Sequence, residues 1–193
     1  GQVLELDANC AYYLDCPGIS AIPSIKNDFV NGLEKAAHDP DKIHITLSMT
    51  FIDLAHAERA AETIALYDDE FPGMFTWSGE LNMMKQALLG NNAEPASIES
   101  IAGWADFMRI FRERGVPVTI HSDLGNDAEP TKFLHLMDHA LASYPDNKIV
   151  WAHMGLSKEL TTMDAREHVR LMSERLDQYP NLYLDISWDV IYN

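Results

Sequence analysis

Four short apolar runs recur along this chain, and each ends in a polar side chain of a kind that binds metals or transfers protons. The runs FTWSGE, VPVTIH, KIVWAH and LYLDIS deliver Glu80, His121, His153 and Asp185, which stand 41, 32 and 32 positions apart. An amphipathic helical stretch fills most of each gap, so every step has the length of one strand and one helix. Such a series predicts a parallel sheet with right-handed crossovers.

Helical periodicity marks the stretches between these runs. The last one places an apolar residue every three or four positions from Ala165 to Tyr179, and similar stripes cover 57–67, 97–114 and 131–144. An earlier stretch carries the apolar stripe Ile22, Ile25, Phe29, Leu33 and Ala36. Residues 43–51 are predicted to form a fifth strand, and residues 2–14 are predicted to hold a sixth.

These elements favour an α/β fold of the (β/α)8 TIM-barrel type over an open doubly wound sheet. The open sheet usually carries a glycine-rich phosphate loop after its first strand, and the sequence contains none. A full barrel needs eight units and about 250 residues. The 193 residues provide five or six βα units and end directly after a strand. We therefore interpret residues 1–193 as a single, partial TIM-barrel domain, the interior piece of a larger barrel.

The charge balance limits the partners that we expect. Thirty acidic residues against 14 basic ones give a net charge of −16, which argues against binding to a nucleic-acid backbone. No apolar run approaches the ~20 residues of a membrane span. The cysteines Cys10 and Cys16 lack the spacing of a zinc or redox pair. We expect a small-molecule substrate, no nucleic acid and no membrane, and we leave a homo-oligomer open.

His121 and His153 are the strongest candidates for chemistry. A histidine that closes an apolar strand points into the mouth of a barrel, where imidazole binds metal or handles protons. One such histidine would more often be structural, but two on consecutive strands, in the same relative place, favour a functional role. Three other histidines stand in polar helical surroundings and are expected at the surface, namely His38, His56 and His168.

Carboxylates accompany these histidines. Glu80 could ligate or bridge a metal or act as a general base, and an ion pair with Lys85 is the alternative. Asp185 could orient a histidine or make a purely structural hydrogen bond. Asp123 could accept a hydrogen bond from an imidazole or a substrate, or cap a loop. The segment from Leu81 to Ser97 is long for a βα connection and is predicted to form a lid.

Four motifs stand in a characteristic order over roughly residues 42–187: GE at 79–80, PVTIH at 117–121, WAHMG at 151–155 and NLYLDIS at 181–187. In this order the chain resembles the amidohydrolase superfamily, specifically the amidohydrolase-2 type of metal-dependent TIM barrel. The resemblance implies that these are strands four to seven and that His121 and His153 bind metal or polarise the scissile carbonyl. It also implies a metal-bridging role for Glu80 and a divalent metal cofactor, with zinc as the expected ion.

Two parts of the family pattern are missing. The HxH pair of the first strand occurs nowhere in the sequence. A degenerate version with Asn9 and Ala11 in place of the histidines is one explanation, although we favour a first strand upstream of Gly1. The aspartate of the eighth strand is also absent, because Asp185 follows His153 too closely and suits the seventh strand better. This chain alone is not expected to assemble the complete metal site of the family.

The leading hypothesis is a metal-dependent hydrolase that uses a metal-activated water to cleave an amide, ester or lactone-like bond. His121 would ligate the metal, His153 would ligate it or stabilise the oxyanion, and Glu80 would bridge metals or act as the base. Some members of the family decarboxylate aromatic acids, so a metal-dependent decarboxylase stays open. A non-catalytic barrel that binds a small ligand is the alternative from a different class.

Overall fold

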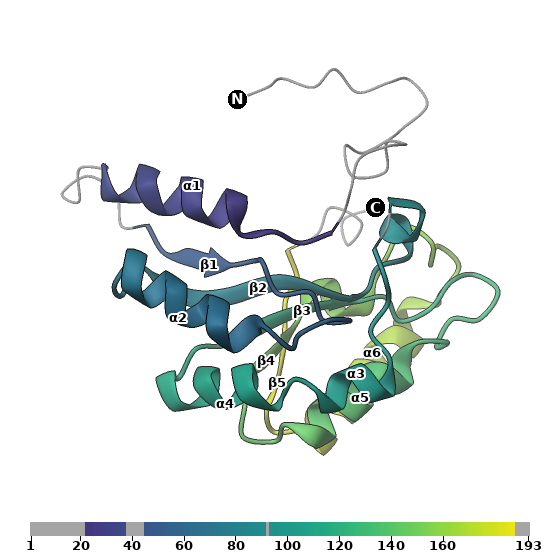
Figure 1. The fold of residues 1–193 in the computed structure, drawn as a ribbon. Coiled ribbons are helices and arrows are strands. Elements are labelled where there is room, and N and C mark those ends of the chain that lie inside the picture. The colour runs from purple at the N-terminus through teal and green to yellow at the C-terminus, as the bar shows by residue number, and fades with distance from the viewer. Residues whose placement is uncertain (1–21, 38–44, 92, 188–193) are drawn as a thin grey trace.

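Strands and helices alternate along the chain in the computed structural model, which describes residues 22–37, 45–91 and 93–187 (Figure 1). The strands are β1 (Leu47–Met49), β2 (Phe75–Met84), β3 (Val118–Ser122), β4 (Ile149–Trp151) and β5 (Leu182–Leu184). The α-helices are α1 (Ile25–Ala36), α2 (Ala60–Glu70), α3 (Ile98–Ala102), α4 (Ala105–Arg114), α5 (Leu134–Ser143) and α6 (Ala165–Gln178). Two 3₁₀ helices, η2 (Gln86–Asn91) and η3 (Ala152–Gly155), follow β2 and β4. The strand predicted over 2–14 lies outside the described residues.

The five strands form one parallel sheet in which the spatial order is the sequence order, β1-β2-β3-β4-β5. A doubly wound sheet reverses its strand order at a switch point, and no reversal occurs among these five strands. The sheet therefore winds in one direction, as the wall of a barrel does. This arrangement is that of part of a TIM barrel and confirms the fold class predicted from the sequence.

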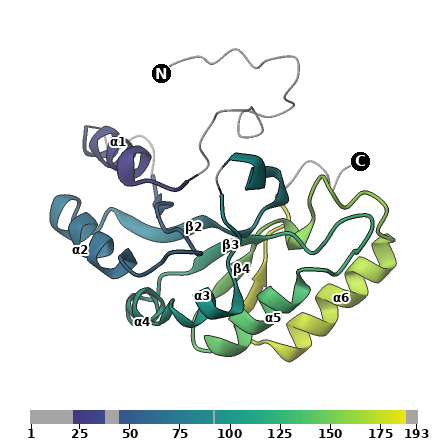
Figure 2. The same ribbon diagram turned by 45° about the vertical axis from the view of Figure 1, so that its right-hand side comes forward.

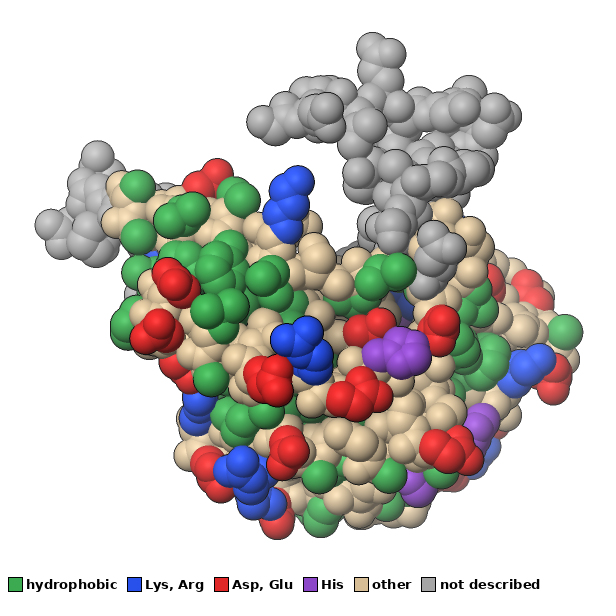
Figure 3. All heavy atoms as spheres, in the orientation of Figure 1, with side chains coloured by type: hydrophobic (Ala, Val, Ile, Leu, Met, Phe, Trp, Pro, Cys, Tyr) green, Lys and Arg blue, Asp and Glu red, His purple; other side chains and the backbone are tan. Residues whose placement is uncertain are grey.

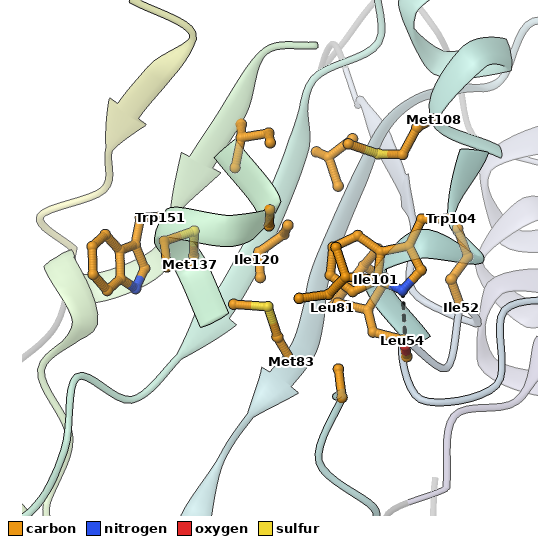
Figure 4. Packing of buried hydrophobic residues seen from close by; sticks show 14 of the residues in the cluster. Ile52, Leu54, Leu81, Met83, Ile101, Trp104, Met108, Ile120, Met137 and Trp151 are labelled. Carbon is orange, nitrogen blue, oxygen red and sulfur yellow. Dashed lines mark hydrogen bonds between the residues drawn. The ribbon is translucent and has the colours of Figure 1, made fainter. Parts of the chain in front are cut away.

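Helices α2 to α6 lie along one face of the sheet and cover it (Figures 1 and 2). Alternate residues of β3 and β4 point to this face and are fully buried, namely Val118, Ile120, Ile149 and Trp151. In Figure 4, Leu81 and Met83 of β2 lie with Ile120 opposite the side chains of α3 and α4. No helix within the described residues is long and apolar enough to cross a membrane.

The opposite face of the sheet is more open. Trp77 of β2 and Tyr183 of β5 are 40% and 49% exposed, and with Thr76 and Val150 they line an open hollow of about 640 Å³. In a closed barrel this face becomes the interior. Its open state agrees with the five described strands forming only part of such a barrel.

The apolar stripe predicted for the first helix is wrong in part. Leu33 is 64% exposed, whereas the buried residues of α1 are Asp28 and Gly32. The cause is the packing of α1 on the end of α2, where the Phe71 ring occupies the space that a side chain at Gly32 would need. Apolar side chains consequently gather on the surface around α1 and α2, at the left of Figure 3.

The single helix predicted over 97–114 is divided into α3 and α4. Gly103 and Trp104 separate the two helices. Trp104 is fully buried, and its indole N–H donates to the carbonyl of Leu54 at 2.9 Å (Figure 4). The break therefore places a large side chain under the loop that follows β1, which periodicity within one segment could not reveal.

Candidate metal centre

Glu80 lies at an irregularity inside β2 and not at the end of that strand. Ser78 pairs with Val118 of β3, but the next pair joins Leu81 to Ile120. Three steps along β2 therefore oppose two steps along β3, which is the geometry of a β-bulge. The extra residue turns the Glu80 side chain out of the regular alternation. The sequence predicted a strand that ends at Glu80, and this boundary is wrong because pairing resumes beyond the bulge.

Gly79 makes the bulge possible. Its φ of 109° lies where side chains are rarely tolerated. A Cβ atom there would overlap the carbonyl oxygen of Thr119 and lie 2.8 Å from its Cβ atom. The carbonyl of Gly79 accepts a hydrogen bond from the hydroxyl of Ser48 in β1. Gly79 therefore allows a close approach of backbone, to which both neighbouring strands contribute.

His121 lies near the end of β3 with its ring between two carboxylates. Its side chain is only 3% exposed. Nδ1 lies 2.9 Å from Oε1 of Glu80, and Nε2 lies 2.9 Å from Oδ1 of the buried Asp123. The ring orientation is thus determined from both sides.

His153 follows β4 by two residues, where the chain leaves the sheet in an unusual turn. The φ angles of His153 and Met154 are 55° and 54°, in the left-handed region. Two contacts support this turn. The His153 backbone N–H donates to Oδ2 of Asp185 at 3.3 Å, and the ring of His168 on α6 bonds the Met154 carbonyl at 2.9 Å. His168 was predicted at the surface, which is wrong, since it is buried by this contact.

The ring of His153 also lies between two carboxylates. Nε2 is 3.2 Å from Oε2 of Glu80, and Nδ1 is 3.4 Å from Oδ2 of Asp185, which directly follows β5. The His121 and His153 rings stand edge to face with their centroids 5.4 Å apart. Glu80 is therefore the common neighbour of both imidazoles, while Asp123 and Asp185 hold their outer nitrogens.

One ligand atom from each of Glu80, His121 and His153 can be chosen so that all three lie within 4.8 Å of one another. Among the described residues this is the one group of three or more histidine, cysteine or acidic side chains that meets that distance. The three residues come from the bulge in β2, the end of β3 and the turn after β4, and they converge near the carboxyl ends of β3 and β4, the side on which barrels of this type keep their active sites. The spacing of these residues in the sequence had already grouped Glu80, His121 and His153 as candidate site residues.

Lys85 adds a positive charge to the cluster. Its Nζ lies 2.9 Å from Oε1 of Glu80, and its side chain is 24% exposed. The ion pair that the sequence offered as the alternative role of Glu80 therefore exists together with the histidine contacts. The two interpretations do not exclude each other, because the carboxylate has two oxygens and approaches three positive or proton-donating groups.

The electrostatics follow from these contacts. Burial favours the neutral carboxyl of Glu80, but hydrogen bonds from His121 and His153 and the charge of Lys85 outweigh it, and the pKa falls well below its usual range. Burial also lowers the pKa of His121, but its bonds to Asp123 and Glu80 prevail and raise the pKa above the ordinary 6.5. The same contacts thus stabilise the charged form of both groups.

The predicted lid is partly replaced by regular structure. Leu81–Met84 belongs to β2, and η2 follows with Leu88 fully buried. The N–H of Ala96 donates to the Met83 carbonyl at 2.8 Å. The segment is thus attached to the sheet at both ends. Sequence reasoning missed one residue in it, Gln86, whose contacts with Asp123 had no signal in the sequence.

The donor set can be compared with the needs of a divalent metal. Two imidazoles and one carboxylate form the ligand set of several catalytic zinc sites, in which a fourth position takes water or substrate. Each histidine here also has a carboxylate on its other nitrogen, an arrangement that is common around protein-bound zinc. The residues therefore fit a divalent ion. Glu80, His121 and His153 would hold it, and these roles stay predictions.

The fold and the site together define a class: a parallel α/β chain of the barrel type with a cluster suited to a divalent metal at the carboxyl ends of its strands. A family model described as amidohydrolase matches residues 99–191, just under half of the chain. The match confirms the resemblance to the amidohydrolase superfamily over these residues. His121, His153 and Asp185 lie inside the matched region, and Glu80 lies before it. Searches of curated proteins and of solved structures found no match.

Proposed function

We propose that this chain contributes the middle part of the active site of a metal-dependent hydrolase, which acts on an amide, ester or lactone-like bond of a small molecule. The family match supports an enzyme of the hydrolase or decarboxylase type. The observation that carries the finer proposal is the convergence of Glu80, His121 and His153 within 4.8 Å. A divalent ion at this position, for which zinc is the expected metal, supplies Lewis acidity that polarises a carbonyl and lowers the pKa of water.

The different exposure of the two histidines suggests a division of roles. His121 is 3% exposed and held by Asp123, which suits a fixed ligand. His153 is 16% exposed, so its ring is the more accessible to a substrate. With Asp185 accepting from Nδ1, the neutral His153 ring has its lone pair on Nε2 and can ligate there. As an imidazolium, the same ring could instead donate from Nε2 to a developing oxyanion. Glu80 lies within reach of both rings and can ligate or accept a proton from water.

Metal content and ester hydrolysis of the full-length protein test this proposal. Elemental analysis should find about one or two zinc ions per chain, and His121→Ala or Glu80→Gln should lower that number. Hydrolysis of 4-nitrophenyl acetate and of dihydrocoumarin, an ester and a lactone probe, should fall in parallel. His135→Ala is the matched control, because His135 is an exposed histidine on α5 and should leave metal content unchanged. Unaltered zinc content in His121→Ala would exclude this residue from the site.

A second candidate, decarboxylation of an aromatic acid, is favoured by Lys85. An ammonium group next to the candidate ligands can bind the carboxylate of a substrate by charge and hydrogen bonds. Release of carbon dioxide from 2-hydroxybenzoate, without hydrolysis of either ester probe, would favour this reaction over hydrolysis. Lys85→Met should then raise KM for the acid, because it removes the positive charge and keeps much of the side-chain volume.

A further inference from the structure

We propose that Asp123 is a positioning residue that fixes the ring tautomer of His121, and that Gln86 in turn fixes Asp123, so that Nδ1 of His121 is the nitrogen offered to the metal. This inference rests on the proposed metal site, since it names the ligand atom. It adds two residues, Asp123 and Gln86, to the candidate centre. Neither belongs to the Glu80–His121–His153 cluster itself.

Gln86 gives one oxygen of Asp123 a fixed role as acceptor. The backbone N–H of Gln86 donates to Oδ2 at 2.8 Å, and its side-chain Nε2 donates to the same oxygen at 3.1 Å. The Gln86 amide is itself oriented, because Nε2 also donates to the Gly125 carbonyl at 2.8 Å and Oε1 accepts from Asn126 at 3.1 Å. Oδ2 of Asp123 thus accepts two hydrogen bonds from Gln86, the first residue of η2.

The other oxygen of Asp123 then determines where the proton of His121 sits. Oδ1 lies 2.9 Å from Nε2 in a buried environment, where Asp123 is 1% exposed. An ionised carboxylate only accepts hydrogen bonds, so Nε2 must carry a proton. A neutral His121 ring consequently has its lone pair on Nδ1, the atom that lies 2.9 Å from Oε1 of Glu80. Nδ1 therefore faces the cluster in the form that a metal requires.

Asp123→Asn should reverse this tautomer while changing almost no volume. The two donors from Gln86 require an oxygen at the Oδ2 position, so the amide of the new side chain must direct its NH₂ group toward Nε2 of His121. An amide donor needs a lone pair on Nε2, and the proton of the neutral ring moves to Nδ1. The ring then presents an N–H to the metal position and loses its capacity to ligate there.

Nitrogen-15 NMR of labelled histidine reads the tautomer directly in the full-length, metal-free protein at a pH above the pKa of His121. We expect the proton on Nε2 in the wild type and on Nδ1 in Asp123→Asn, with the Kd for Zn²⁺ raised about 10–100-fold. Asp127→Asn is the matched control, because Asp127 lies in the same loop and accepts from Thr161 and Thr162 instead. It should retain the wild-type tautomer and Kd. Gln86→Met should weaken Zn²⁺ binding by a smaller factor than Asp123→Asn.

The outcomes separate this inference from the proposed function. If the His121 ring of the wild type carries its proton on Nδ1, the inference is overturned even if zinc binds. This test needs only the wild-type protein and so does not depend on the folding of a variant. The inference is equally overturned if Asp123→Asn keeps both the tautomer and the zinc affinity. An unchanged Kd in Gln86→Met removes Gln86 from it. If both tautomers are as expected and Zn²⁺ does not bind the wild type, the proposed metal site fails while the control of the ring by Asp123 stands.

Discussion

Replacement of Gly79 by alanine tests whether the bulge in β2 is required for the site. The structure makes two separate demands at this position. The φ of 109° disfavours any side chain, and a Cβ atom would overlap the Thr119 carbonyl oxygen in the neighbouring strand. Gly73 provides a matched comparison, because its φ is also positive, 70°, but a Cβ atom added there would meet nothing within 4 Å.

The magnitudes follow from these two demands. A left-handed conformation costs an alanine roughly 1–2 kcal/mol, and the loss of unfolded-state entropy offsets about 0.4–1 kcal/mol of it. We therefore expect Gly73→Ala to lower the free energy of unfolding by about 1 kcal/mol. Gly79→Ala adds a steric overlap with backbone that cannot rotate away, and overpacking of this kind costs typically another 1–3 kcal/mol. The expected total for Gly79→Ala is about 2–4 kcal/mol.

Urea unfolding followed by circular dichroism gives both values, provided that the slope m is unchanged. Zinc titration of the folded fraction supplies a second readout, since a shift of the bulge moves Glu80 away from the two histidines. Gly79→Ala should weaken zinc binding, and Gly73→Ala should not. The reasoning is refuted if the two variants lose the same stability, because the clash with Thr119 would then have no energetic weight.

Three further perturbations give distinct outcomes. Glu80→Gln should make the free energy of unfolding less sensitive to acid. Because the pKa of Glu80 is lowered in the folded state, its contribution to stability is present above the ordinary pKa of 4.5 and is lost as pH falls. Unfolding at a series of pH values measures this difference. Zinc affinity should rise as pH increases through the raised pKa of His121, because the metal must displace a proton from a ring whose pKa exceeds 6.5. Calorimetry in buffers of different ionisation enthalpy should detect the released proton. Asp28→Ala should lower the free energy of unfolding by about 3 kcal/mol or more, since this fully buried carboxylate accepts from the N–H and hydroxyl of Thr50 and from the hydroxyl of Tyr67. Burial raises the pKa of Tyr67 most and Asp28 raises it further, so in that variant an ultraviolet titration should show this pKa falling part of the way toward 10.

The repeating pattern of strands and helices was sufficient to predict the fold class because it depends on local periodicity. Apolar runs of this length tend to form buried strands, and amphipathic helices tend to pack one face on the sheet between them. The same regularity grouped Glu80, His121 and His153, since residues at equivalent places in successive parallel strands meet at one edge. Asp185 also lies where the spacing indicated, in contact with His153.

Features that depend on contacts between distant segments could not be predicted in this way. The exposure of Leu33 follows from the position of α1 against Phe71, and the break before α4 follows from the pocket that Trp104 fills beneath Leu54. His168 looked like a surface residue because its sequence neighbours are polar, yet its ring supports a turn 14 residues away. Single-segment periodicity contains no information about such partners.

Two departures from regular geometry among the described residues occur at candidate ligands. The bulge at Gly79 turns Glu80 out of the strand alternation, and the left-handed turn does the same for His153. The left-handed conformation of His153 has a cost of order 1–3 kcal/mol and persists only where the surroundings enforce it. Here Ser48 and Thr119 contact the bulge, while Asp185 and His168 support the turn. His121 keeps ordinary strand dihedral angles within β3, and Asp123 with Gln86 determines the orientation of its ring. The bulge and the left-handed turn therefore bring Glu80 and His153 to His121, and the candidate metal site is built around the ring of His121.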